Sequence, residues 1–241
     1  MKEDMRRTAG PRVNAHSSGI EVHVEQHVKD KMEGWCSAAN SEVSGLFCVN
    51  LLNGIFTVYD VFLPEQQGSS GFTKMDGYAT GRLYGYLQRK YGVSGMADLK
   101  GWWHTHYNFG VFWSGTDDDT AQSNAQLAED WSLSIVINQK GDWLARVDVV
   151  SPIPVMVDEL PIRFISNTKG SRLRDYGRDI ARWVKPLQTQ PRSTSNHLEI
   201  HGLTEQYRPL ESVLDCPCGD NTCRACSETL SYYADKEVIH V

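Results

Sequence analysis

Residues 99–117 read LKGWWHTHYNFGVFWSGTD, a pattern typical of a buried strand, a loop and the start of a helix. The apolar residues before His104 predict the strand, and the acidic run from Asp117 suits a first helical turn, where the helix dipole favours negative charge. Alternate side chains of an extended segment share a face, so His104 and His106 can be directed at one ion. Asp117 can add a carboxylate. Two imidazoles and one carboxylate leave one tetrahedral position open, which is typical of a catalytic rather than a structural zinc site.

The neighbouring segments are expected to alternate between helices and strand pairs. In chain order these are a helix over residues 20–35, a strand pair around the Asn53-Gly54 turn, a loop over 64–73, a helix over 74–91, the strand and helix already described, and a strand pair around QKGD at 139–142. This order predicts a mixed α/β or α+β domain over about residues 18–160. Within the second helix, Gly77, Gly81 and Gly85 recur every fourth residue, which indicates either close approach of another element or simple tolerance.

The composition excludes several classes of protein. The chain has 241 residues, of which 40% are hydrophobic and 22% are charged, so it is neither disordered nor fibrous. Its net charge of −6 argues against a protein that binds nucleic acid along its whole length. No apolar run is long enough to span a bilayer, and the start, MKEDMRRTAGPRVN, lacks the apolar core of a signal peptide. We therefore expect a cytoplasmic protein with no membrane partner.

The composition changes after residue 160. Residues 163–192 hold eight Lys or Arg against two Asp, and Tyr176, Ile180 and Trp183 form an apolar stripe, which predicts an amphipathic helix with a solvated basic face. A linker-like QTQPRSTSN follows.

The remaining tail contains a cluster of cysteines with the spacing C-x-C-x4-C-x2-C, formed by Cys216, Cys218, Cys223 and Cys226. Four thiolates suit a second, structural zinc. The alternatives are an iron–sulfur cluster, a disulfide or redox switch, and plain thiols. We expect the tail to dock a substrate or a protein partner.

The spacing from His104 to Asp117, H-T-H-x7-S-x-x-D, resembles the motif of the JAMM (MPN+, Mov34/JAB1) metalloproteases, which is H-[ST]-H-x7-S-x-x-D with an upstream glutamate. That glutamate typically lies in an E-x-x-G segment between the first helix and the first strand. Here SEVSGLF, with Glu42, occupies that place. The segment GWWHTH is also similar to the family's GW-aromatic-HSH. The resemblance covers about residues 20–160.

The resemblance implies a cytidine-deaminase-like three-layer sandwich around a mixed sheet, with zinc bound by His104, His106 and Asp117. It implies that Glu42 is the general acid/base and that Ser114 helps to stabilise the oxyanion. The implied reaction is hydrolysis of isopeptide or peptide bonds after the C-terminus of ubiquitin or a ubiquitin-like protein. We accordingly expect a flexible lead over 1–18, a JAB/MPN-like metalloprotease domain over 19–160, and a helical, Cys-rich appendage over 161–241.

Several alternatives remain open from the sequence. The family usually has proline after the second histidine, and Tyr107 stands there instead, which bears on the substrate-facing loop. A non-catalytic scaffold of the same fold, or another zinc amidase such as a peptidoglycan-peptide hydrolase, would share the motif. Ser114-x-x-Asp117 is also a helix-capping pattern. Other candidates exist for the carboxylate roles, namely Glu25, Glu33 and Glu65 in place of Glu42, and Asp118 or Asp119 in place of Asp117.

Overall fold

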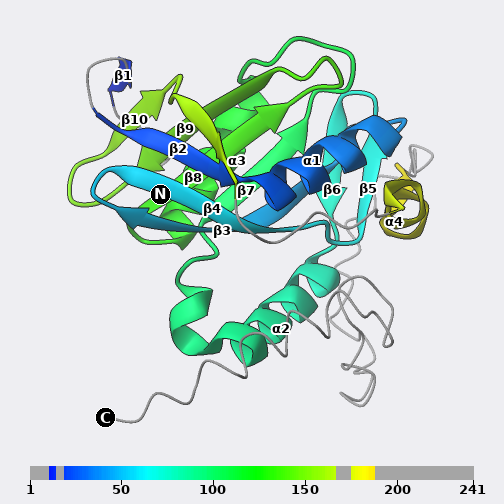
Figure 1. Ribbon diagram of the computed structural model, residues 1–241, viewed down its shortest axis with the longest axis horizontal. Coiled ribbons are helices and arrows are strands. Elements are labelled where there is room, and N and C mark those ends of the chain that lie inside the picture. Colours follow the sequence, from blue (N-terminus) through cyan, green and yellow to red (C-terminus); the bar gives the residue numbers. More distant parts are fainter. Residues whose placement is uncertain (1–10, 15–18, 167–174, 188–241) are drawn as a thin grey trace, which may run out of the picture.

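A nine-stranded mixed sheet forms the centre of the fold (Figure 1). The computed structural model describes residues 11–14, 19–166 and 175–187, so the cysteine cluster lies outside the described residues. The strands lie in the order β1-β10-β9-β8-β7-β3-β4-β2-β11. Their bounds are β1 Arg12–Asn14, β2 Glu21–Glu25, β3 Ser44–Leu52, β4 Ile55–Phe62, β7 Gly101–Thr105, β8 Trp131–Ile137, β9 Trp143–Val149, β10 Val155–Asp158 and β11 Ile162–Ile165.

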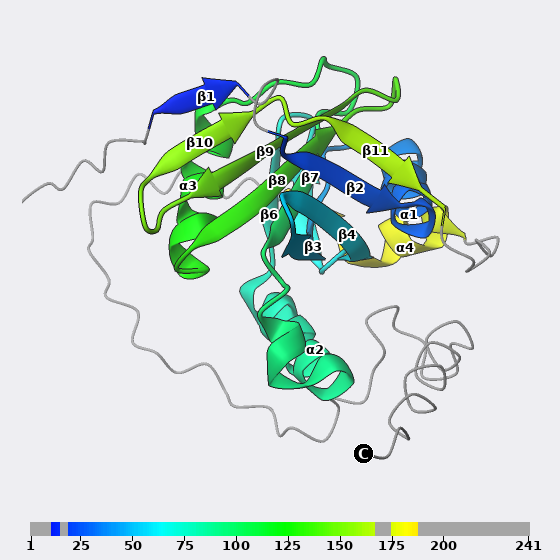
Figure 2. The same ribbon diagram turned by 60° about the vertical axis from the view of Figure 1, so that its left-hand side comes forward.

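Helices cover both faces of this sheet. Figure 2 shows α1 and α4 together on one side, α3 on the other, and α2 standing out below the sheet. The helices are α1 Gln26–Ala38, α2 Gly77–Met96, α3 Gly115–Leu127 and α4 Tyr176–Trp183. A separate small sheet joins β12 (Val184–Pro186), β5 (Gln66–Ser69) and β6 (Phe72–Met75). The expected mixed α/β architecture is confirmed, and no helix in the described ranges is both long and apolar enough to cross a membrane.

The middle strand, β7, divides the core into two clusters. It pairs antiparallel with β3 and parallel with β8. Trp103 is fully buried on the α1 side, where its ring stacks on Trp35 with the centroids 5.8 Å apart. Trp102 is on the opposite face, in a cluster with Leu83 and Leu87 of α2. Since side chains alternate along a strand, His104 shares the face of Trp102.

The helix predicted over residues 20–35 is wrong at its start, because residues 21–25 form β2 and α1 begins only at Gln26. Val24, Val28 and Met32 do recur every fourth residue and are all buried. However, Val22 is buried as well, which is the period of a strand. β2 pairs in parallel with both β4 and β11, and these partners are distant in sequence. This pairing overrides the local helical pattern.

The loop predicted over residues 64–73 is also corrected, since β5 and β6 form a hairpin there. Gln66 is fully buried, and its amide accepts from the Ser44 N–H and donates to the Ser44 carbonyl, each at 2.8 Å.

The suggested close approach of another element to the glycines of α2 is not observed, because a Cβ on Gly77 or Gly81 would meet nothing within 4 Å. Of the two interpretations of these glycines, simple tolerance of glycine in this helix is therefore the one that remains.

The described residues beyond 160, which are 161–166 and 175–187, continue to pack on the domain. β11 pairs with β2, and α4 packs on α1. Trp35 Nε1 donates to Asp179 Oδ2 at 2.7 Å, and the Trp35 ring meets Tyr176 edge-on. Arg178 and Arg182 are exposed, so the predicted amphipathic helix with a solvated basic face is confirmed over Tyr176–Trp183.

Candidate metal centre

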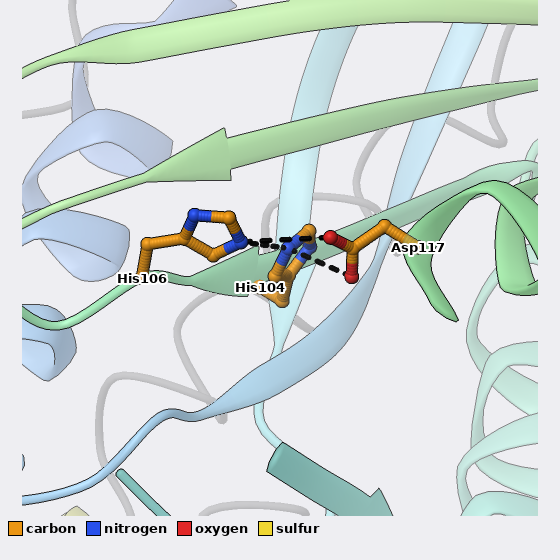
Figure 3. A group of neighbouring side chains, drawn as sticks. All are labelled: His104, His106 and Asp117. Carbon is orange, nitrogen blue, oxygen red and sulfur yellow. Dashed lines mark hydrogen bonds and ion pairs between the residues drawn. The ribbon is translucent and has the colours of Figure 1, made fainter. Parts of the chain in front are cut away.

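His104 and His106 come from the end of the middle strand and the residue that follows it. Their Nε2 atoms lie 3.1 Å apart, and both side chains are buried (Figure 3). Gly101 allows β7 to lie close to β3, because a Cβ there would overlap the ring of Phe47. His104 therefore belongs to a tightly packed strand, and His106 directly follows it, with its N–H bonded to the Ile137 carbonyl of β8.

Asp117 joins the histidines from the first turn of α3. Its Oδ1 lies 3.2 Å from His104 Nε2, and its Oδ2 lies 3.5 Å from His106 Nε2. Ser114 caps this helix: the backbone N–H of Ser114 donates to Asp117 Oδ2 at 2.8 Å, and its hydroxyl donates to the same oxygen at 2.6 Å. Asp117 can therefore take part in the helix cap and also serve as a metal ligand, because the contacts with Ser114 orient its carboxylate.

The three donors fit a divalent metal ion. One ligand atom from each residue lies within 4.8 Å of the others, and in the described part of the chain this is the one group of three or more potential ligands. Two imidazole nitrogens 3.1 Å apart satisfy each other only when one carries a proton, whereas a single cation would satisfy both lone pairs and the carboxylate. Borderline nitrogen and oxygen donors suit zinc among other metals.

Hydrogen bonds fix the form in which the ligands are presented. His106 Nδ1 lies 3.0 Å from the carbonyl oxygen of Gly110, which can only accept, so Nδ1 carries the proton and, in the neutral ring, the lone pair of Nε2 is available to a metal ion. A backbone carbonyl behind a histidine ligand is common at metal sites. His104 Nδ1 is buried and has no partner among the described residues.

The pKa values of these groups show how strongly they interact. Burial lowers the pKa of His104, which favours the neutral form that binds metal. Burial also opposes the charge of His106, but its hydrogen bonds to Asp117 and Gly110 outweigh this and raise its pKa. Burial alone would raise the pKa of Asp117, yet hydrogen bonds from both histidines hold it well below its usual range. Asp117 is therefore ionised at neutral pH.

Glu42 lies beside this group. The pairing of β3 with β7 sets Ser44 opposite His104, and the same register continued by two residues sets Glu42 opposite His106. Glu42 is only 8% exposed, and its backbone N–H donates to the Ser69 carbonyl of β5 at 2.8 Å. Burial raises the pKa of Glu42 to about 7; the charge of His106 opposes this rise and the charge of Asp117 adds to it.

The competing carboxylates have other partners. Glu25 pairs with His27, Glu33 with Lys29, and Glu65 with Arg82. Asp118 pairs with Arg146. The side chain of Asp119 is exposed. The structure therefore leaves Glu42 and Asp117 as the carboxylates of this site.

Aromatic side chains enclose the histidines. The ring of His104 stacks on Trp102 with centroids 4.4 Å apart, and the ring centroid of Trp113 lies 6.0 Å from that of His104. Phe112 meets His106 edge-on at 4.6 Å. The contact between Trp102 and a candidate ligand was not predicted from the sequence.

Tyr107, directly after the second histidine, has a φ of 41°. Its carbonyl accepts from the Gln139 N–H at 3.0 Å, which holds the loop against the end of β8. Proline cannot adopt this φ, so the proline usual in the JAMM family could not stand here without a change of backbone.

Comparison with known proteins adds no assignment. A scan against protein-family models finds no match for this chain, and a search of curated proteins finds none either. Support for a function therefore comes from the geometry of the site and from the motif that its residues form.

Proposed function

We propose that this protein is a zinc-dependent amide hydrolase of the JAMM (MPN+) type, which cleaves isopeptide or peptide bonds after the C-terminus of a ubiquitin-like protein. The observation that carries the proposal is the buried group of His104, His106 and Asp117 beside a glutamate, Glu42, whose pKa is about 7. A mixed sheet with helices on both faces supports the related proposal of a cytidine-deaminase-like fold.

In this proposal His104, His106 and Asp117 hold the ion, which when bound supplies a Lewis acid that polarises the scissile carbonyl and acidifies water. Glu42 takes the proton from the attacking water and returns it to the leaving amine. In the metal-free protein burial raises the pKa of Glu42 to about 7, and a carboxyl near neutrality is a useful base when ionised and a useful acid when protonated.

Ser114 has two roles to reconcile. Its hydroxyl carries one proton, which is donated to Asp117 Oδ2 in this structure. To stabilise an oxyanion, as the resemblance implies, the hydroxyl would have to turn from Asp117 toward the substrate. Orientation of Asp117 is the role supported by the observed contacts.

A second candidate, a zinc amidase acting on another amide such as a peptidoglycan peptide, is favoured by one observation. The backbone of Tyr107 excludes proline, so the loop beside His106 differs from the loop that the family's usual proline would form. The chemistry of bond cleavage is the same in both candidates, and the substrate differs.

The test uses the zinc-loaded full chain and a set of probes: peptides with Gly-Gly linked to a lysine side chain, ubiquitin-like fusions, linear peptides and peptidoglycan peptides. We expect cleavage of the ubiquitin-like and Gly-Gly-lysine probes, detected by mass spectrometry. Glu42→Gln should abolish cleavage while retaining the metal, and Glu65→Gln provides the matched exposed control. Hydrolysis by the Glu42→Gln variant would overturn the mechanism, and cleavage of peptidoglycan peptides alone would favour the second candidate.

A further inference from the structure

Arg146 is a fully buried cation next to the candidate metal centre. It lies on β9 with 0% exposure of its side chain. Taking a charge out of water costs several kcal/mol, and pairing it inside the protein often does no more than offset that cost, so well-packed apolar residues in place of a buried ion pair are often no less stable. The charge therefore calls for an explanation beyond stability, and the proposed reaction gives Arg146 no chemical step.

The partners of Arg146 flank the turn that carries Asp117. Its Nη1 pairs with Asp118, the residue that follows Asp117 in α3. Its Cζ lies 4.6 Å from the ring centroid of Trp113, the residue that precedes the cap Ser114. The guanidinium thus contacts the chain on both sides of the four-residue turn from Ser114 to Asp117.

Two further contacts anchor this arrangement to the sheet. Arg146 Nε donates to Asp148 Oδ2 at 2.9 Å, within β9. Trp113 Nε1 donates to Asp158 Oδ1 at 2.9 Å, at the end of β10. Trp113 in turn lies 6.0 Å from the ring of His104. A continuous set of contacts therefore runs from β9 and β10 to a histidine ligand and to the turn of the carboxylate ligand.

We propose that Arg146 is a positioning residue of the metal centre, which clamps the turn between Trp113 and Asp118 so that Asp117 meets His104 and His106. The inference depends on the proposed function, since it assumes that these three residues bind a metal. A planar guanidinium can pair with Asp118, bond Asp148 and stack on Trp113 at once. The point charge of lysine cannot replace this combination.

The test measures the metal affinity of the full chain by competition with a chelator. Only the one equivalent of metal that is absent from the His104→Ala variant is counted, because that metal belongs to this site. Arg146→Lys keeps the positive charge and removes the planar guanidinium with its several N–H donors. Asp118→Asn removes the partner at the partly exposed end, where the side chain is 48% exposed, so that folding is preserved. The matched controls are Arg163→Lys, an exposed arginine on the edge strand β11, and Asp119→Asn, one residue along the same helix.

We expect Arg146→Lys and Asp118→Asn to weaken zinc affinity by about 10- to 100-fold, the range typical of residues that orient metal ligands. We also expect both to shift the visible absorption of the cobalt-substituted protein, which reports ligand geometry. The two controls should leave affinity and spectrum unchanged. Wild-type affinity and spectrum in Arg146→Lys and Asp118→Asn would overturn this inference alone, whereas absence of any metal sensitive to His104→Ala would overturn the proposed function as well.

Discussion

Replacing Glu42 with glutamine should stabilise the metal-free protein, and should do so more at high pH than at low pH. The carboxyl is buried, and its pKa is raised from 4.5 to about 7. Below 4.5 it is protonated in both the folded and the unfolded chain, so glutamine is a close neutral substitute. Above 7 it is ionised in both, and only the folded chain bears the cost of burying the charge.

The size of the effect follows from the pKa. A rise from 4.5 to about 7 corresponds to about 3 kcal/mol between the two protonation states. Stability contributed by the raised pKa is present below pH 4.5 and is lost as pH rises through 7. Glu42→Gln should therefore increase the free energy of unfolding relative to wild type by about 3 kcal/mol more at high pH than at low pH, and most of this difference develops between about pH 5 and about pH 8.

The assay is urea denaturation of chelator-treated protein at two pH values, about pH 5 and about pH 8. Comparing the variant with wild type cancels the titration of all other groups that the substitution leaves unchanged. Glu65→Gln is the control, because the Glu65 side chain is 43% exposed and its pair with Arg82 spans 3.7 Å, so it should give a small and similar change at both pH values. An equal effect of Glu42→Gln at the two pH values would show that burial does not raise the pKa of Glu42 toward neutrality, and would remove the case for a general base at this position.

Other substitutions test the supports of the site. Ser114→Ala removes the cap of α3 and should lower the free energy of unfolding by about 1 kcal/mol, measured by urea denaturation, and weaken metal affinity; unchanged metal affinity would contradict its role in orienting Asp117. Gly101→Ala forces a methyl group against the ring of Phe47 and should cost about 1–3 kcal/mol by the same assay; a fully stable variant would show that β7 and β3 are less tightly packed. Tyr107→Pro cannot keep a φ of 41° and should weaken metal affinity in a chelator competition. Retained affinity would mean that the loop does not help to place His106.

The part of the site that is close in sequence could be predicted, because local spacing determines it. His104 and His106 lie on one face of a strand, and Asp117 follows a capped turn, so one short segment supplies all three candidate ligands. The turn at Asn53-Gly54 was likewise predictable, since both residues adopt positive φ values of 52° and 82°.

The parts that depend on distant partners could not be predicted in this way. β2 follows the same apolar spacing as a helix and is a strand only because β4 and β11 flank it. β5 is stabilised by β12, more than a hundred residues later in the chain. Arg146 gave a signal as a lone cation within the apolar strand WLARVDV, but its partners Asp118 and Trp113 are known only from the fold.

The most direct test of the central claim is the metal content of the full chain, measured by elemental analysis for wild type, His104→Ala and Glu42→Gln. We expect wild type and Glu42→Gln to hold the same amount of zinc and His104→Ala to hold one equivalent less. The comparison isolates this site from any metal bound by the cysteines at 216–226. Equal metal content in wild type and His104→Ala would contradict the claim that His104, His106 and Asp117 form a metal centre.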